Sequence, residues 1–305
     1  MEEKKDYRKE LFYEKKNGYD SMDAAAREAM EAYCEGYKAY LNDSRTEREA
    51  VANAIRLAER EGFVEYRAGM ELKAGDKVWF NNRGKALMLA VAGKKPLSEG
   101  AVVAAAHVDA PRLDLKQTPL YEDNELAFFK THYYGGIKKY QWTAIPLELH
   151  GVVATKDGEV IEVVIGREKD DPQFVISDLL PHLAADQMKK TLAEGVTGEG
   201  LNILIGSAPY ADEGADRVKL AVMSILNSRY DITEEDFISA ELCAVPAFEV
   251  RDIGLDRSLI GAYGHDDRVC AYAELKAIFD VKEPERPACA SWPTRRRRAP
   301  TAFPA

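Results

Sequence analysis

The first third of the chain has the hydrophobic periodicity of α-helices. Over residues 21–43, apolar side chains recur every three or four positions, which predicts an amphipathic helix. A second helix is predicted over residues 44–62, because Ser44 and Glu47 have the spacing of a capping box and Gly62 supplies a helix end. This part of the chain is therefore predicted to be mainly helical.

Strands are predicted next, over residues 77–82, 86–93 and 101–109. The last of these, AVVAAAHVD, is apolar up to His107, as expected for a strand buried on both faces of a largely parallel sheet. Loops at the carboxyl ends of such strands are where α/β proteins place their functional sites. The hydrophobic pattern therefore directs attention to His107 and to Asp109, which follows it.

From about residue 113 the pattern changes to short segments rich in aromatic and β-branched residues. Gly-rich or charged turns separate these segments, which cover residues 126–136, 142–155 and 159–166. This pattern predicts antiparallel β-structure. The earlier pattern returns near residue 256, and a buried strand, a polar loop and a helix are predicted within residues 259–280. The simplest interpretation is one α/β domain interrupted by a β-rich insertion.

Composition narrows the classes of protein that fit. With 305 residues, 46% of them hydrophobic, the chain can bury a substantial core, and two domains are expected. The net charge of −10 does not suit nucleic-acid binding, which needs a concentrated basic face. No apolar run reaches the roughly 20 residues of a membrane span, and the charged N-terminal segment lacks the apolar core of a signal peptide. Four scattered cysteines without metal-type spacing suit a reducing cytosol, so we expect a cytoplasmic protein without disulfides.

Two polar segments each follow a predicted strand. The first contains His107 and Asp109, and the second is the run His265–Asp266–Asp267–Arg268. Imidazole and carboxylate are suitable ligands for zinc or a similar divalent ion. Asp109 has the spacing to hold His107 through its other ring nitrogen, and a carboxylate from the second segment could bridge two ions.

Simpler interpretations stay open on these residues alone. A His-x-Asp pair at a strand end is often a surface hydrogen-bond pair, since short motifs are weak signals. An Asp-Asp pair at the start of a helix is often an N-cap, a position that Asp favours without any ligand.

Several longer segments make the chain similar to a known family. They are AAHVDAPRLDLK, YYGGIKKYQWTAIPLELHGVV, FVISDLLPHLAADQMKK, SAELCAVPAFEVRDIGLDRSLIGAYGHDDRVCAYAEL and EPER. With these segments in this order, the chain resembles the aspartyl aminopeptidases, which are cytosolic aminopeptidases with two zinc ions. The resemblance runs from the first helices to about Cys289.

The resemblance implies a zinc-exopeptidase-like α/β fold, in which a mixed sheet is flanked by helices and carries an inserted β-rich domain. The implied divisions are the first part of the peptidase domain (1–112), the inserted oligomerisation domain (113–255), an incomplete second part of the peptidase domain (256–289) and an aberrant basic tail (290–305).

The resemblance also implies roles for residues of the candidate site. His107 corresponds to the family's first metal-ligand His, and Asp109 corresponds to the Asp that orients it. Asp266 corresponds to the carboxylate that bridges two divalent metal ions, for which zinc is expected. Asp267 is then expected to support the site or to cap the helix, and His265, which has no ligand counterpart, to make local hydrogen bonds.

The partners implied by the resemblance are peptides with a free N-terminus and further copies of the chain. Neither nucleic acid nor a membrane is expected, and members of the family often assemble as dodecamers through the inserted domain. Members selective for acidic N-terminal residues have a His in the segment beginning Tyr-Gly-Gly, where this chain has Tyr140. The preference for Asp or Glu at the substrate N-terminus therefore stays open.

A second departure concerns the catalytic groups. The family's general-base Glu, the metal-binding Glu beside it, a further Asp and a C-terminal His have no counterpart in the 305 residues. The resemblance thus implies a metal-dependent aminopeptidase, and the chain, truncated relative to the family, is expected to be inactive by itself. The alternative function is that of a non-catalytic truncated product that retains only the capacity to assemble.

The segment ASWPTRRRRAPTAFPA, residues 290–305, has two interpretations. It is a genuine basic tail, which could bind anionic partners, or it is the product of a shifted reading frame. With suitable codons, a shifted frame yields a peptide similar to the family's missing Glu-Glu segment.

Overall fold

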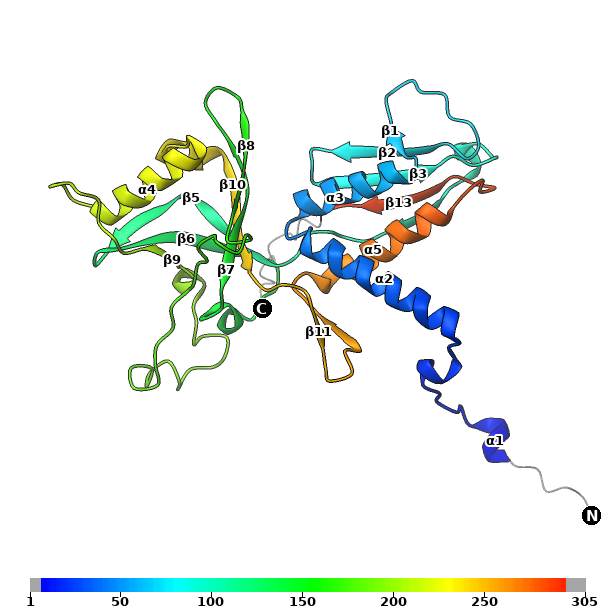
Figure 1. Cartoon of the computed structure of the whole chain (residues 1–305), viewed down its shortest axis with the longest axis horizontal. Coiled ribbons are helices and arrows are strands. Elements are labelled where there is room, and N and C mark those ends of the chain that lie inside the picture. Colours follow the sequence, from blue (N-terminus) through cyan, green and yellow to red (C-terminus); the bar gives the residue numbers. More distant parts are fainter. Residues whose placement is uncertain (1–6, 295–305) are drawn as a thin grey trace, which may run out of the picture.

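The computed structural model describes residues 7–294 and places most strands in two separate sheets (Figure 1). Sheet A is mixed and has the order β1 (Val64–Glu65), β2 (Lys77–Asn82), β3 (Ala86–Val91), β13 (Ala288–Trp292) and β4 (Val102–Ala105). Sheet B is antiparallel and has the order β8 (Val160–Ile165), β7 (Leu147–Ala154), β10 (Ala240–Pro246), β5 (Arg112–Asp123), β6 (Leu126–Tyr134) and β9 (Ile203–Gly206). A third, two-stranded sheet pairs β11 (Arg251–Ile253) with β12 (Leu259–Gly261). The mixed α/β fold predicted from the sequence is thereby confirmed.

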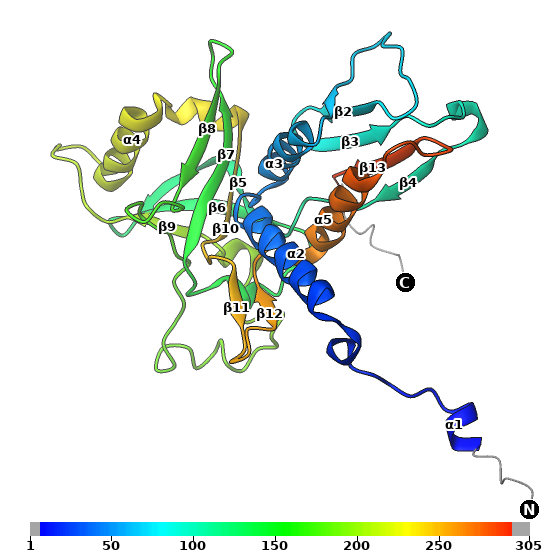
Figure 2. The same ribbon diagram turned by 45° about the vertical axis from the view of Figure 1, so that its right-hand side comes forward.

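Long helices cover one face of sheet A (Figure 2). They are α2 (Ala24–Asn42), α3 (Glu47–Arg60) and α5 (His265–Asp280). Their apolar positions recur on one side, so helices and sheet together bury a core that includes Leu41, Val51, Leu89, Leu275 and Trp292. This core fixes α5 against the interior strand β13 and against the edge strand β4, which ends shortly before His107.

The opposite face of sheet A presents apolar side chains to solvent. The strand register places Phe80, Met88 and Val103 on this face, and they are 52%, 44% and 59% exposed. Exposed apolar side chains gathered on one sheet face are unusual for a soluble monomer.

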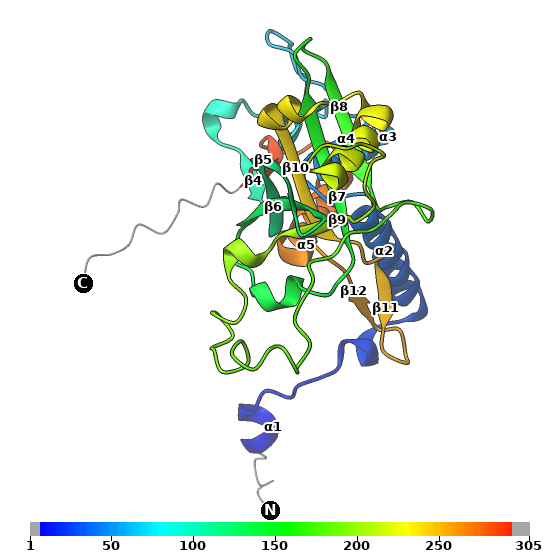
Figure 3. The same cartoon turned by 90° about the vertical axis from the view of Figure 1, so that its left-hand side faces the viewer.

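Sheet B has a separate apolar core. Its buried residues include Leu113, Leu147, Val163, Ile203 and Leu242. The helix α4 (Arg217–Tyr230) packs on β5, β6 and β9, and it faces the viewer in Figure 3. The other short helices are α1 (Tyr7–Leu11), η1 (Gly18–Ser21), η2 (Leu97–Glu99), η3 (Lys139–Trp142), η4 (Gly198–Gly200) and η5 (Glu234–Ser239).

The second predicted helix begins at a different residue from the one expected. The capping box consists of Thr46 and Glu49, because the Glu49 carboxylate accepts from Thr46 N while Thr46 Oγ1 accepts from Glu49 N. Ser44 is buried and accepts a hydrogen bond from Asn53 instead. Two overlapping patterns of the form Ser/Thr-x-x-Glu occur here, and the second one is used.

Two predicted burial patterns are wrong. β4 was expected to be buried on both faces, but all four of its residues are exposed because it pairs only with β13, at one edge of sheet A. β12 was expected to be a buried strand, but it is a three-residue strand of a hairpin, and its first residue Leu259 is 63% exposed.

The predicted division at residue 289 needs correction. It falls inside β13, whose residues 290–292 pair with β3 and whose residues 290 and 291 also pair with β4. Ala290 and Trp292 are buried, so the apolar alternation of Ala-Ser-Trp continues the strand. The basic tail predicted over 290–305 lies, from residue 295 onwards, outside the described residues.

Other predictions on the chain can be compared directly with the structure. The predicted inserted domain, 113–255, begins one residue after the start of β5 and ends in the turn between β11 and β12. All four cysteines are free thiols. Within residues 7–294, no helix combines the length and the apolar character needed to cross a membrane.

Candidate metal centre

The structure brings together the two polar segments that the sequence singled out. His107 follows β4, and Asp266 lies in the first turn of α5. His107 Nε2 is 3.2 Å from Asp266 Oδ1, and the Asp266 side chain is 81% exposed. Packing of α5 against β4 and β13 produces this approach of two residues that are distant in sequence.

The neighbours of His107 determine which ring nitrogen carries the proton. Its Nδ1 lies 2.8 Å from the backbone oxygen of Asp109 and 3.4 Å from Asp109 Oδ1. A carbonyl oxygen can only accept, so Nδ1–H is the donor and Nε2 of the neutral ring keeps its lone pair. That lone pair is directed to the side where Asp266 lies.

Asp109 is held by a residue of sheet B. Its carboxylate is buried, and Oδ2 accepts a hydrogen bond of 2.6 Å from the Tyr134 hydroxyl at the end of β6. Burial and the bond to Asp109 raise the pKa of the Tyr134 hydroxyl, so it remains a donor at neutral pH.

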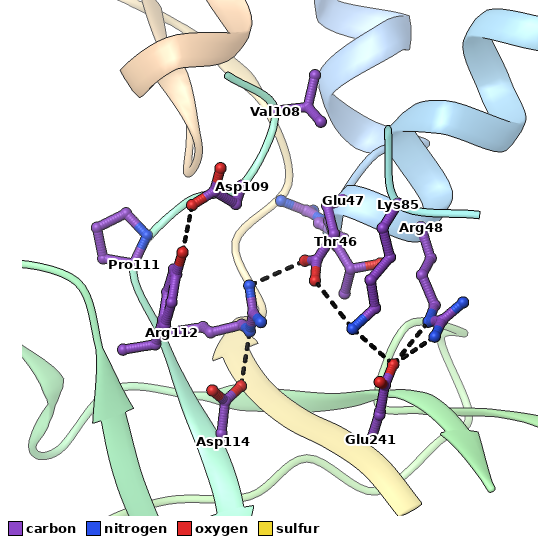
Figure 4. Close-up of polar contacts among 12 residues, drawn as sticks. Thr46, Glu47, Arg48, Lys85, Val108, Asp109, Pro111, Arg112, Asp114 and Glu241 are labelled. Carbon is purple, nitrogen blue, oxygen red and sulfur yellow. Dashed lines mark hydrogen bonds and ion pairs between the residues drawn. The ribbon is translucent and has the colours of Figure 1, made fainter. Parts of the chain in front are cut away.

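Tyr134 in turn lies against a paired guanidinium. The Arg112 guanidinium carbon is 4.5 Å from the centroid of the Tyr134 ring. Arg112 donates to Glu47 (2.9 Å) at the start of α3 and to Asp114 (2.6 Å) in β5 (Figure 4). Burial lowers the pKa of the guanidinium, but the surrounding carboxylates outweigh it and raise the pKa, so Arg112 stays charged.

The backbone of the loop after β4 is fixed from the side of α5. Arg268 is completely buried, and it donates from Nε to Val108 O and from Nη2 to Arg45 O, both at 3.1 Å. The Tyr263 hydroxyl donates to Pro111 O at 2.8 Å. Gly264, at φ 92°, is required beside Arg268, because a Cβ there would collide with the guanidinium.

The pair His107 and Asp266 fits a zinc ion on two grounds. Two ligands held at about 2.0–2.1 Å from one tetrahedral zinc ion lie about 3.3 Å apart. Nε2 of the Nδ1–H tautomer and a carboxylate oxygen are both electron-pair donors, and their separation of 3.2 Å suits a cation held between them. The described residues 7–294 contain no group of three or more His, Cys, Asp or Glu that could hold a metal ion.

The other polar residues of the second segment make contacts away from this pair. His265 Nδ1 is 2.9 Å from the Tyr37 hydroxyl, and its Nε2 is 3.1 Å from Ile260 O. Both ring nitrogens are therefore used locally, in agreement with the role expected for His265. Asp267 is joined to Asp266 by a cis peptide bond and pairs with Cys270, whose pKa this contact raises. Tyr140 lies in η3 and is 37% exposed.

Sequence reasoning missed Tyr134, Arg112 and Arg268 as parts of the site. Arg268 directly follows the Asp pair of the second polar segment. The sequence therefore drew attention to this position, but it did not indicate that the side chain points into the core. Tyr134 lies in the quoted segment YYGG, yet nothing local indicates that it reaches Asp109.

A second buried charge cluster lies between α3 and sheet B. His150 Nδ1 is 2.8 Å from Glu49 Oε1, and His150 Nε2 is 3.3 Å from Glu148 Oε1. Arg45 Nε lies 3.1 Å from that same Glu148 oxygen, and Arg167 approaches Glu49 at 3.6 Å. Burial disfavours a charged His150, but hydrogen bonds to both carboxylates raise its pKa to about 9.

Comparison with known proteins gives one consistent family. A family model described as aminopeptidase I zinc metalloprotease (M18) matches residues 40–291. A probable M18 family aminopeptidase 1 of Clostridium acetobutylicum is 47% identical over 282 residues, which cover 91% of this chain and 61% of that relative. A crystal structure of an M18 family aminopeptidase from Thermotoga maritima has a TM-score of 0.86 and 43% identity, covering 92% of this chain and 61% of that one. Aminopeptidase I from Borrelia burgdorferi gives a TM-score of 0.83 and 38% identity, covering 92% and 65%. The chain spans less than two thirds of the length of the curated relatives it matches.

Proposed function

The chain belongs to the M18 family of zinc metalloproteases, and from this premise we propose that its activity is zinc-dependent removal of N-terminal residues from peptides. The observation that supports the proposal is the approach of His107 Nε2 to Asp266 Oδ1 at 3.2 Å, a ligand–ligand separation for zinc.

Each residue of the site has a distinct part in this proposal. His107 is a metal ligand through Nε2. Asp109 orients the ring, because its backbone oxygen accepts the hydrogen bond from Nδ1–H and its carboxylate lies beside that nitrogen. Asp266 is exposed enough for its two carboxylate oxygens to reach two separate ions, so we assign it as the bridging ligand. Zinc bound there would lower the pKa of a water molecule and polarise the scissile carbonyl.

The proposal also covers the conditions under which the activity appears. Two protein ligands leave a tetrahedral zinc ion with two positions to fill, and no carboxylate among residues 7–294 joins this pair. We therefore expect the 305-residue chain by itself to bind zinc weakly and to lack measurable peptidase activity. The alternative remains a non-catalytic role in assembly, and it is favoured by the intact core of sheet B and by Ile225 of α4, which is 65% exposed.

Partners and location follow from the same premise. We propose that the substrates are peptides with a free N-terminus, that the chain acts in the cytoplasm, and that it assembles into a homo-oligomer through sheet B and α4. Size-exclusion chromatography with light scattering tests the assembly. A monomer at all concentrations would contradict it, and Ile225→Lys should reduce any oligomer formed.

Metal binding is the direct test of the site. Cobalt(II) absorption and zinc calorimetry should detect binding to the 305-residue chain that His107→Ala and Asp266→Ala each abolish. Asp267→Ala is the matched control, since it changes the neighbouring carboxylate, and it should retain binding. Equal binding by wild type, His107→Ala and Asp266→Ala would overturn the assignment.

Activity is tested on two proteins, the 305-residue chain and the longer probable M18 family aminopeptidase 1 of Clostridium acetobutylicum. Hydrolysis of peptides with free but not acetylated N-termini, by the second protein only, is the expected result. Activity of the 305-residue chain that His107→Ala does not affect would show that another site is responsible. Substrates with N-terminal Asp, Glu, Leu and Lys would define the preference that Tyr140 leaves open.

A further inference from the structure

We propose that Tyr134 and Arg112, two residues of sheet B, are positioning residues that set the orientation and the tautomer of His107 by fixing Asp109. The inference rests on the proposed metal centre, because it gives His107 the role of a ligand. It goes beyond that proposal by making sheet B a part of the metal site.

The first step is the contact between His107 and Asp109. The ring nitrogen Nδ1 lies between the backbone oxygen of Asp109 at 2.8 Å and its carboxylate Oδ1 at 3.4 Å. The carbonyl accepts from Nδ1–H, and the nearby negative charge adds to the preference for a proton on that side of the ring. The position of the Asp109 carboxylate therefore determines how firmly Nε2 is kept as the free, metal-binding nitrogen.

The second step is the contact between Asp109 and Tyr134. The hydroxyl donates to Oδ2 at 2.6 Å, the oxygen that does not face His107. Asp109 is 5% exposed, so water does not compete freely for this oxygen. A short hydrogen bond to a charged, buried acceptor is among the stronger ones in proteins. Tyr134 thereby holds the carboxylate in the rotamer that places Oδ1 beside the ring.

The third step is the contact between Tyr134 and Arg112. The guanidinium lies over the ring, 4.5 Å from its centroid, which is a cation–π arrangement. Glu47 and Asp114 hold the guanidinium in that plane through separate nitrogens, Nη1 and Nε (Figure 4). The aromatic ring is thus packed against a side chain that is itself fixed from α3 and from β5.

These contacts connect elements of both sheets. Asp109 follows β4 of sheet A, Tyr134 ends β6 of sheet B, and Glu47 opens α3, which packs on sheet A. Any change in the relative placement of the sheets would move Tyr134 and, through Asp109, the metal-binding nitrogen. The metal site therefore depends on the junction between the sheets as well as on its ligands.

The test compares Tyr134→Phe with Tyr133→Phe in the 305-residue chain. The first removes the hydroxyl and keeps the ring beside Arg112. The second makes the same chemical change one residue earlier, at an exposed position whose ring stacks on His132. A purely structural role would affect the melting temperature, so the readouts are the His107 tautomer and the affinity for cobalt(II).

The tautomer is read without metal. The chain has five histidines, so selective ¹⁵N labelling gives few ring signals, and the signal lost in His107→Gln identifies His107. Wild type and Tyr133→Phe are expected to show predominantly Nδ1–H, whereas Tyr134→Phe should show a mixture of both tautomers. Asp109→Asn should give the same mixture, which keeps the test usable if Tyr134→Phe does not fold.

The cobalt affinity is read by competition with a chromophoric chelator. Tyr134→Phe is expected to weaken it about 10-fold, the lower end of the range for residues that support metal ligands. Arg112→Lys keeps the positive charge but loses the planar guanidinium that lies over the Tyr134 ring. A smaller decrease in cobalt affinity than in Tyr134→Phe is expected. An unchanged tautomer and affinity in Arg112→Lys would remove Arg112 from the proposal.

The outcomes separate this inference from the proposed function. Wild type that binds cobalt, with both readouts unchanged in Tyr134→Phe, would overturn the inference and leave the metal centre in place. Wild type that binds no cobalt, with a tautomer that responds to Tyr134→Phe but not to Tyr133→Phe, would overturn the metal centre and support the positioning of His107.

Discussion

His107 Nε2 and Asp266 Oδ1 face each other at 3.2 Å although one follows β4 and the other opens α5. Neither atom can donate to the other when His107 is neutral with its proton on Nδ1. A cation placed between them would bind both lone pairs. Packing of α5 on sheet A brings the two side chains together, so the hydrophobic core determines the geometry of the site.

Metal removal should therefore change the stability of the chain. A ligand that binds only the folded state stabilises it by RT ln(1 + [L]/Kd), which is about 2.7 kcal/mol at 100 times Kd. We expect saturating zinc to raise the melting temperature and excess chelator to reverse the rise. Calorimetry of wild type and Asp266→Ala measures this, and the variant should not respond. An equal zinc-dependent rise in both proteins would place the ion elsewhere.

Replacing Arg268 should destabilise the fold. Arg268→Met preserves most of the side-chain volume but leaves Val108 O and Arg45 O without their buried donor. Each unsatisfied buried acceptor costs about 1–3 kcal/mol, so a loss of about 2–6 kcal/mol is expected. Urea denaturation measures it. Arg257→Met, at an exposed guanidinium, is the control and should change stability little.

The helix cap distinguishes the observed start of α3 from the predicted one. Thr46→Ala removes the cap acceptor and should cost about 1 kcal/mol of unfolding free energy, whereas Thr46→Ser keeps the oxygen and should cost less. Chemical denaturation of both variants gives the comparison. Equal stability of Thr46→Ala and wild type would show that the cap contributes nothing.

The sequence indicated the candidate ligands because their signal is local. A polar residue directly after an apolar strand, as at His107, or at the start of a helix, as at Asp266, is visible in a short window. The limits of β2 were visible for the same reason. The capping box was predicted at Ser44 and Glu47 from the pattern Ser/Thr-x-x-Glu. The same pattern recurs two residues later, and Thr46 and Glu49 form the box.

What the sequence could not supply depends on contacts between distant segments. The hydrophobicity of β4 indicates a preference for burial, but exposure is decided by its place at the edge of sheet A. Tyr134 has the pattern of an ordinary aromatic strand residue, and only the junction of the two sheets brings it to Asp109. In the sequence, Arg268 cannot be distinguished from an arginine on the exposed face of a helix, yet it is fully buried.

The exposed apolar face of sheet A should govern the solubility of the isolated chain. Phe80, Met88 and Val103 lie on it, and apolar sheet faces and edges promote association. We expect aggregation of the wild-type chain, reduced by Phe80→Thr with Val103→Thr. Light scattering at increasing concentration measures this, and Leu255→Thr, at an exposed turn residue, is the control. A monodisperse wild-type chain at high concentration would contradict the expectation.

The buried cluster around His150 should make stability depend on pH. Its folded pKa of about 9 is above the ordinary value of 6.5, so the stabilisation is fully present below pH 6.5 and is lost as the pH rises through 9. The shift corresponds to about 3 kcal/mol at most. Urea denaturation between pH 6 and 9.5 should show this loss in wild type and in His132→Gln, an exposed control, but not in His150→Gln.

Glu49 contributes in the opposite direction, because its contact with His150 lowers the pKa of the Glu49 carboxyl despite burial, and that part is lost only in acid. A wild-type chain and His150→Gln with the same slope between pH 6.5 and 9.5 would show that His150 is not charged in the folded state. Arg45 and Arg167 also face this cluster and are present in both proteins, so the difference between the two slopes reports on the imidazole.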